Sequence, residues 1–208
     1  MQVGTYKGLP RIIIDPGESY VTKKNEIIST LLGSCVAACL YDPVNRVIGM
    51  NHFLLAQQHS AHTAALLGTA HKATLLGTES GRYGIHAMEL LINQMLKQGA
   101  QRIHLKAKAF GGGDVLKLGN ELRGGKSIGA INCEFIKTFL RTEKIPLVAS
   151  ALGGDIGRNI FFLTSDFSVY VKSIERDEEL TILHQERRFL KKNTGITLPQ
   201  PLDQADFW

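Results

Sequence analysis

The chain has 208 residues, of which 44% are hydrophobic and 21% charged, and its formal net charge is +5. This composition favours a folded core over disorder, and no nucleic-acid-binding motif accompanies the mild positive charge. No apolar run approaches the length of about eighteen residues that a membrane-spanning helix needs, and the N-terminus lacks the apolar run of a signal peptide. We therefore expect a cytoplasmic protein without membrane insertion, whose three cysteines are free thiols.

The first quarter of the chain has the pattern of β-strands. Apolar residues gather at 11–14 and 26–31, and two further apolar runs cover 36–41 and 46–55. The stretch 42–45, Asp-Pro-Val-Asn, separates the last two runs and has the composition of a turn. This spacing predicts a β-meander with buried faces.

The middle of the chain changes in composition. Residues 57–81 are rich in Ala, Thr, His and Gly, which is typical of a long loop or an insertion. Apolar residues at helical spacing then predict a helix over 82–98, which Gly99 ends. Strict alternation over 102–110 predicts a strand with one solvated face.

The second half of the chain adds a helix at 132–142 and strands at 147–150 and 160–171. Strands outnumber helices and do not alternate regularly with them, which favours an α+β fold over a doubly wound one. We expect a layered sandwich of mixed β-sheets with flanking helices. Residues 1–175 are predicted to form this domain, and 176–208 a charged C-terminal extension that is partly helical.

A cysteine and a histidine stand at positions that suit nucleophilic chemistry. Cys35 follows the turn Gly33-Ser34 at the start of an apolar run, where backbone N–H groups of the turn are free. His52 lies in the next apolar run, which is too apolar to need an imidazole. If the two runs form adjacent strands, the imidazole can stabilise the thiolate and later protonate a leaving group.

Two further features complete this candidate site. A third polar group must orient the imidazole, and the hydroxyls of Ser29 and Thr30 lie just upstream. Strand alternation favours Ser29, because it shares parity with Cys35 while Thr30 points away, unless the intervening turn resets the parity. The turn at Gly33 and Ser34 supplies N–H groups for an oxyanion, a contribution typically worth about 3 kcal/mol.

Structural and metal-binding interpretations of these residues are open alternatives. A buried cysteine commonly behaves as a small hydrophobe, and Cys39 and Cys133 fit that role. Zinc would draw on Cys35, Cys39 and His52, with His59, His62 and His71 nearby in sequence. Positions four apart on a strand lie about 13 Å apart, so the two cysteines are poorly spaced for one ion. We therefore expect no metal.

The strings around these residues resemble the CheD family of chemoreceptor glutamine deamidases. The resemblance rests on residues 29–43, which contain Gly33-Ser34-Cys35, and on Asn51-His52-Phe53. Weaker matches follow in the same order at 82–88, 106–113 and 152–158, so that the similarity covers roughly residues 10–172. The order and spacing of these strings together make the resemblance specific.

The resemblance implies a cysteine hydrolase with a layered α/β fold related to bacterial toxin deamidases, with Cys35 as nucleophile and His52 as base. Such an enzyme converts glutamine side chains of methyl-accepting chemoreceptors into glutamates, releases ammonia and uses no metal or organic cofactor. The implied partners are the receptors and, for some members, a CheY-phosphate phosphatase of the CheC type. A non-catalytic adaptor that binds receptors or such a phosphatase is the alternative function.

The chain departs from the family pattern at several positions. The family's third catalytic residue is a threonine six positions before the cysteine, where this chain has Ser29. Ser29 keeps the hydroxyl but lacks the methyl group that restricts the rotamer. Ala151 and Ile131 replace an aspartate and an arginine of many members. We expect these departures to affect partner binding more than the nucleophile.

Overall fold

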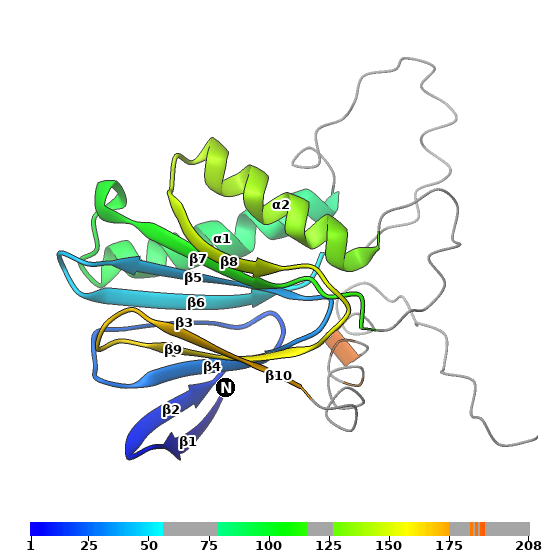
Figure 1. Cartoon of the computed structure of the whole chain (residues 1–208). Helices are drawn as coiled ribbons and strands as arrows, with labels where there is room; N and C mark the ends of the chain where they lie inside the picture. Colours follow the sequence, from blue (N-terminus) through cyan, green and yellow to red (C-terminus); the bar gives the residue numbers. More distant parts are fainter. Residues whose placement is uncertain (56–78, 116–126, 175–183, 185, 187, 190–208) are drawn as a thin grey trace, which may run out of the picture.

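A computed structural model of the chain describes residues 1–55, 79–115 and 127–174, together with 184, 186, 188 and 189. These residues form three layers, shown in Figure 1: two five-stranded sheets stacked face to face, and two helices over the outer face of one sheet. The α+β layered sandwich predicted from the sequence is confirmed. No helix of the described residues is long and apolar enough to cross a membrane.

The first sheet, the lower one in Figure 1, has the strand order β1-β2-β4-β9-β10. Strands β2 and β4 run parallel, and the other neighbours are antiparallel. The strands are β1 (Gln2–Tyr6), β2 (Leu9–Ile13), β4 (Ile27–Leu32), β9 (Arg158–Leu163) and β10 (Val169–Ser173). Strand β4 therefore lies in the middle of this sheet, where both of its edges are paired.

The second sheet has the order β3-β6-β5-β7-β8, and only β7 and β8 run parallel in it. Its strands are β3 (Ser19–Thr22), β5 (Val36–Asp42), β6 (Val47–Phe53), β7 (Lys106–Gly111) and β8 (Leu147–Leu152). The predicted pairing of the strands that follow Cys35 and contain His52 is confirmed, because Ala37 of β5 lies opposite His52 of β6.

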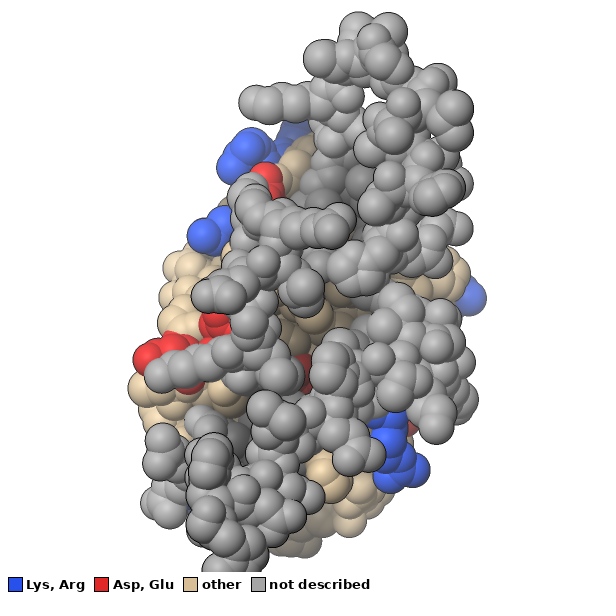
Figure 2. All heavy atoms as spheres, turned by 90° about the vertical axis from the view of Figure 1, so that its right-hand side faces the viewer, with Lys and Arg blue, Asp and Glu red and all other residues tan. Residues whose placement is uncertain are grey.

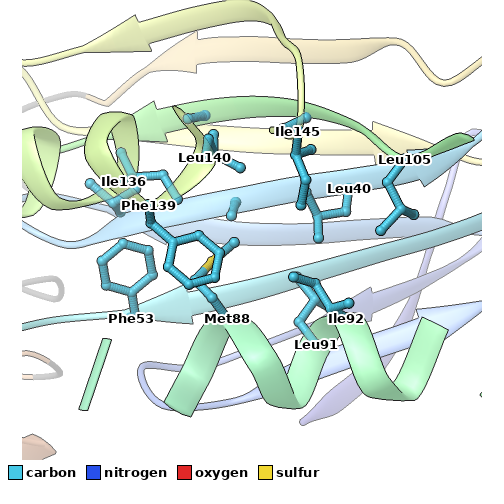
Figure 3. Close-up of a cluster of buried hydrophobic side chains, with 14 of the residues drawn as sticks. Leu40, Phe53, Met88, Leu91, Ile92, Leu105, Ile136, Phe139, Leu140 and Ile145 are labelled. Carbon is cyan, nitrogen blue, oxygen red and sulfur yellow. The ribbon is translucent and has the colours of Figure 1, made fainter. Parts of the chain in front are cut away.

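Both predicted helices are present. Helix α1 spans Glu79–Lys97, and helix α2 spans Ile128–Thr142, where the Ser127 hydroxyl accepts a hydrogen bond from the Ala130 N–H at the N-terminus. Leu40 and Phe53 of the second sheet pack against side chains of these helices, as Figure 3 shows. The helical contributors labelled there are Met88, Leu91 and Ile92 of α1, and Ile136, Phe139 and Leu140 of α2.

Two predicted strands differ from the structure. Residues 102–104 form a 3₁₀ helix instead of the start of a strand, and Ile103, which the alternation assigned to the buried face, is 85% exposed. The predicted strand 160–171 is an antiparallel pair, β9 and β10, joined by a turn in which Asp166 accepts hydrogen bonds from Ser168. In both places a turn stabilised by local hydrogen bonds interrupts an apolar run.

The predicted meander is wrong in one respect that affects the site. Strand β4 is not beside β5, because the turn at Gly33 and Ser34 carries the chain from the first sheet into the second. The residues before the turn and Cys35 after it therefore belong to facing sheets. The space between the sheets is filled by a second apolar cluster that includes Ile28, Leu32, Cys35, Met50 and Phe162.

Candidate active site

Cys35 directly precedes β5 and faces the layer between the sheets. Its side chain is fully buried, together with Ala37 and Cys39, which follow it on the same face of the strand. Val36 and Ala38 alternate with them and pack toward the helices. The alternation of β5 thus directs the thiol away from the helices and toward the first sheet.

The glycine-rich end of β7 holds the backbone at Cys35. The Cys35 carbonyl accepts a hydrogen bond of 2.6 Å from the Gly112 N–H, and the Gly33 carbonyl accepts one of 2.7 Å from the Gly113 N–H. A Cβ at Gly111, whose φ is +104°, would lie 2.3 Å from the Cys35 carbonyl oxygen. Because glycine has no Cβ, the backbone at 111–113 can approach the backbone at Cys35 closely enough to make these hydrogen bonds.

His52 lies on β6, on the same face of the second sheet as Cys35. It is directly opposite Ala37, so Cys35 occupies the diagonal position two residues along the neighbouring strand. Diagonal positions in an antiparallel pair are about 7–8 Å apart, which long side chains can bridge. The His52 backbone is fixed on the other side by hydrogen bonds with Gly17 and Glu18.

Thr30 of β4 contacts the imidazole from the facing sheet. Its Oγ1 lies 2.8 Å from His52 Nδ1, and the hydroxyl donates its proton to the Ile14 carbonyl at 2.7 Å. Because a hydroxyl has only one proton, Oγ1 must accept from His52 Nδ1–H. This tautomer leaves Nε2 with a free lone pair, and Nε2 is buried with no hydrogen-bond partner among the described residues.

The preference for Ser29 as the residue that orients His52 is corrected by this contact. Ser29 Oγ accepts a hydrogen bond of 2.6 Å from Arg11 Nε, on the face of β4 opposite to Thr30. Counting parity from Ser29 to Cys35 assumed one continuous sheet. Since β4 and β5 belong to facing sheets, the residue that points at the layer between them is Thr30.

Burial keeps both reactive groups neutral in this form of the protein. Burial lowers the pKa of His52 to about 3, opposed by a backbone interaction with Ile14. Burial raises the pKa of the Cys35 thiol well above its usual range, and the nearby Glu186 carboxylate raises it further. Near pH 7, the Cys35 thiol and the His52 imidazole are therefore both uncharged.

Glu186 is a site residue that the sequence did not predict. One of its oxygens, Oε2, accepts a hydrogen bond of 2.6 Å from Ser34 Oγ, and Oε1 accepts one of 3.0 Å from the Cys35 backbone N–H. The glutamate is 4% exposed. It comes from the predicted C-terminal extension, 151 residues from Cys35, and no local pattern marks such a distant contact.

Asn132 of α2 ties the same turn to the helical layer. Its side-chain amide donates to the Ser34 carbonyl at 2.7 Å, and its side-chain oxygen accepts from the Leu55 N–H at 2.9 Å. The residue is fully buried. The residues predicted as a turn and oxyanion site, Gly33 and Ser34, are thus held between β7 and α2.

The metal alternative finds no support in the described part of the chain, where no group of three or more His, Cys, Asp or Glu side chains is arranged to hold an ion. Cys39 lies in the core between the sheets, and burial raises the pKa of its thiol. The histidines at 59, 62 and 71 lie outside the described residues.

Comparison with known proteins identifies the family. The sequence pattern described as CheD chemotactic sensory transduction matches residues 66–173, about half of the chain. A protein of Shewanella oneidensis named "Probable chemoreceptor glutamine deamidase CheD 2" is 49% identical over 177 residues, which are 84% of this chain and 83% of that protein. This chain belongs to the CheD family. The resemblance inferred from the motifs is confirmed.

Further CheD relatives extend the similarity along the chain. "Probable chemoreceptor glutamine deamidase CheD 1" of Geobacter sulfurreducens is 43% identical over 197 residues, which cover 95% of this chain and 93% of that protein. A CheD of Rhizobium rhizogenes is 38% identical and covers 94% of both chains. Matches of this extent span the β4–β6 region with Cys35 and His52, which the family pattern at 66–173 does not reach.

Two departures from the family pattern have places in this CheD fold. Ala151 on β8 is half-buried against the core between the sheets, and Ile131 on α2 is half-buried against the core beneath the helices. Apolar side chains at these positions add to packing, where an aspartate or an arginine would need a polar partner.

Proposed function

We propose that this CheD deamidates glutamine side chains of chemoreceptors, with Cys35 as the nucleophile and His52 as the base. The substrate class comes from the names of the relatives, which are described as probable chemoreceptor glutamine deamidases. The observation that carries the proposal is the Thr30–His52 hydrogen bond. It leaves His52 Nε2 without a hydrogen-bond partner among the described residues, on the face of the sheet that also bears the Cys35 thiol.

The first half of the reaction forms a thioester. His52 Nε2 removes the thiol proton, and the Cys35 sulfur attacks the side-chain carbonyl carbon of a glutamine. The C–N bond then breaks, and the imidazolium returns the proton to the departing nitrogen, which leaves as ammonia. The Cys35 backbone N–H is the donor for the oxygen that becomes negative, a contribution typically worth about 3 kcal/mol.

The second half of the reaction releases glutamate. His52 takes a proton from water, the hydroxide attacks the thioester carbon, and the C–S bond breaks. The imidazolium then reprotonates the sulfur, so the resting thiol and neutral imidazole are restored. Throughout, Thr30 is a positioning residue, because it holds Nδ1–H and keeps Nε2 available.

Mass spectrometry of a receptor's cytoplasmic fragment tests the proposal. Incubation with the full chain should add about one dalton per modified glutamine, since amide becomes acid. The Cys35→Ala variant should produce no change, while Cys39→Ala, which alters a core thiol on the same strand, should keep the activity. Full activity of Cys35→Ala would show that the nucleophile is wrong.

A non-catalytic adaptor is the second candidate function, and the complete burial of Cys35 favours it. In that case Cys35→Ala cells would keep normal receptor binding and chemotaxis. A CheC-type phosphatase is the predicted additional partner, which co-elution with the full chain on size-exclusion chromatography would test. The predicted cytoplasmic location is tested by cell fractionation with an antibody against the chain.

A further inference from the structure

We propose that Glu186 is a built-in product analogue, which occupies the position of the substrate side chain and keeps the enzyme in a resting form. The proposal rests on the proposed deamidation, because that reaction leaves a glutamate carboxylate next to the nucleophile. Glu186 presents the same chemical group, on a side chain of the same length, from within the chain.

The contacts of the carboxylate are those expected of a bound product. Oε1 accepts from the Cys35 N–H at 3.0 Å, which is the donor that the reaction needs for its oxyanion. Oε2 accepts from Ser34 Oγ at 2.6 Å. A substrate carbonyl cannot use the Cys35 N–H while this charge-assisted hydrogen bond is made. Binding of substrate and binding of Glu186 are therefore mutually exclusive at this donor.

A second described residue of the same region contacts the folded domain. Phe189 follows Glu186 by three positions, and both residues are helical. The Phe189 ring contacts Gly17, where a Cβ would lie 2.3 Å from it, and its centroid is 6.2 Å from that of Tyr83. His184 and Arg188 are exposed. Figure 1 shows this short segment, in orange, at the end of the sheets.

The contacts of Glu186 with the described residues are made to neutral donors. In Figure 2, which looks onto this end of the molecule, the visible Lys and Arg side chains of the described residues form separate groups instead of one basic patch. The carboxylate is held by one backbone N–H and one hydroxyl, and it is buried. A specific site for a carboxylate, next to the nucleophile, explains these contacts.

The carboxylate also suppresses the reactivity of the thiol. After burial, the charge of Glu186 is the next largest cause of the raised pKa of Cys35, because a negative neighbour disfavours the thiolate. The thiolate is the reactive form. Displacement of Glu186 therefore removes a repulsive charge and frees the oxyanion donor in one step.

Alkylation of Cys35 by iodoacetamide, located by peptide mass spectrometry, tests whether Glu186 covers the site. In the full chain, Glu186→Ala should raise the rate at Cys35 by about tenfold or more, as expected for the loss of two charge-assisted hydrogen bonds. Arg188→Ala, an exposed change on the same segment, should leave the rate unchanged. Equal rates at Cys35 in the wild type and Glu186→Ala would overturn the proposal.

The other two cysteines show whether Glu186→Ala keeps its fold. Cys39 and Cys133 are buried, so their labelling should stay slow in a folded variant. Faster labelling of all three would indicate unfolding, and the isosteric variant Glu186→Gln then decides the question. If its introduced amide lies at Cys35, the chain should convert it to the acid, with a gain of about one dalton at position 186. The Cys35→Ala background should abolish the conversion.

Receptor deamidation separates this proposal from the proposed function. Glu186→Ala should deamidate a receptor fragment several-fold faster than the wild type. Loss of activity in a folded Glu186→Ala would overturn the proposal, because Glu186 would then serve the reaction. Persistence of the Glu186→Gln amide in a preparation that deamidates receptors would overturn it too. Glu186→Ala could speed the alkylation of Cys35 while neither this variant nor the wild type deamidates receptors. In that case the proposal that Glu186 occupies the site stands, and the proposed function fails.

Discussion

Thr30 and His52 come from facing sheets and are joined by a hydrogen bond of 2.8 Å between Oγ1 and Nδ1. The Ile14 carbonyl takes the only proton of the hydroxyl, which makes Thr30 the acceptor and assigns the Nδ1–H tautomer to the imidazole. The Ile14 carbonyl, which directly follows β2, thus sets the direction of the hydrogen bond that orients His52 on the second sheet.

Thr30→Val should lower kcat for receptor deamidation by about a hundredfold, because nothing would hold Nδ1–H and keep Nε2 available as the base. Thr30→Ser retains the hydroxyl and should keep most of the activity. Ser29→Ala, which removes a hydroxyl bonded to Arg11 on the other face of β4, is the matched control and should change kcat little. A larger loss in Ser29→Ala than in Thr30→Val would contradict the assignment.

Acid should destabilise the protein through His52. Its folded-state pKa of about 3 lies below the ordinary value of 6.5, so between these limits the unfolded chain binds a proton that the native state does not. Stability is therefore lost as the pH falls from about 6.5, and at pH 5 the loss from this group is about 2 kcal/mol. Urea unfolding of the wild type at pH 7 and pH 5 measures the change. The His52→Gln variant should lack this part of it, and an identical pH dependence would refute the prediction.

Gly111→Ala should displace the backbone at Cys35. The added Cβ would lie 2.3 Å from the Cys35 carbonyl oxygen, whereas a Cβ at Gly153 meets no atom within 4 Å, and both glycines have positive φ. Gly153→Ala therefore measures the conformational cost alone. We expect Gly111→Ala to lose about 2 kcal/mol more in denaturant unfolding and to lower activity strongly. Equal losses in the two variants would argue against the close approach.

Asn132→Ala should loosen the turn that carries the nucleophile. The change leaves the Ser34 carbonyl and the Leu55 N–H without their side-chain partner, and each buried group without a partner costs about 1–3 kcal/mol. Denaturant unfolding should show a loss of about 2–6 kcal/mol. Asn93→Ala, an exposed asparagine of α1, should change stability by less than about 0.5 kcal/mol. Similar values for both variants would mean that Asn132 does not support the turn.

Local patterns were sufficient for most of the secondary structure and for part of the site. The helical spacing at 82–98 and 132–142 predicted α1 and α2, because a helix that covers a sheet needs one apolar face. The turn at 42–45 predicted that the strands with Cys35 and His52 pair, and β5 and β6 do. Such predictions succeed because the interactions behind them join residues close in sequence.

The family, the layered fold class and the neighbouring strands that bear Cys35 and His52 could all be predicted from the amino-acid sequence, since each follows from periodicity, turn composition or motif order. The contact of Thr30, and not Ser29, with His52 and the hydrogen bond from the Cys35 N–H to Glu186 emerge from the folded structure. The reason is geometric. Parity holds along one strand but not across a turn that joins two facing sheets, and a contact between residues 151 positions apart depends on how the whole chain packs.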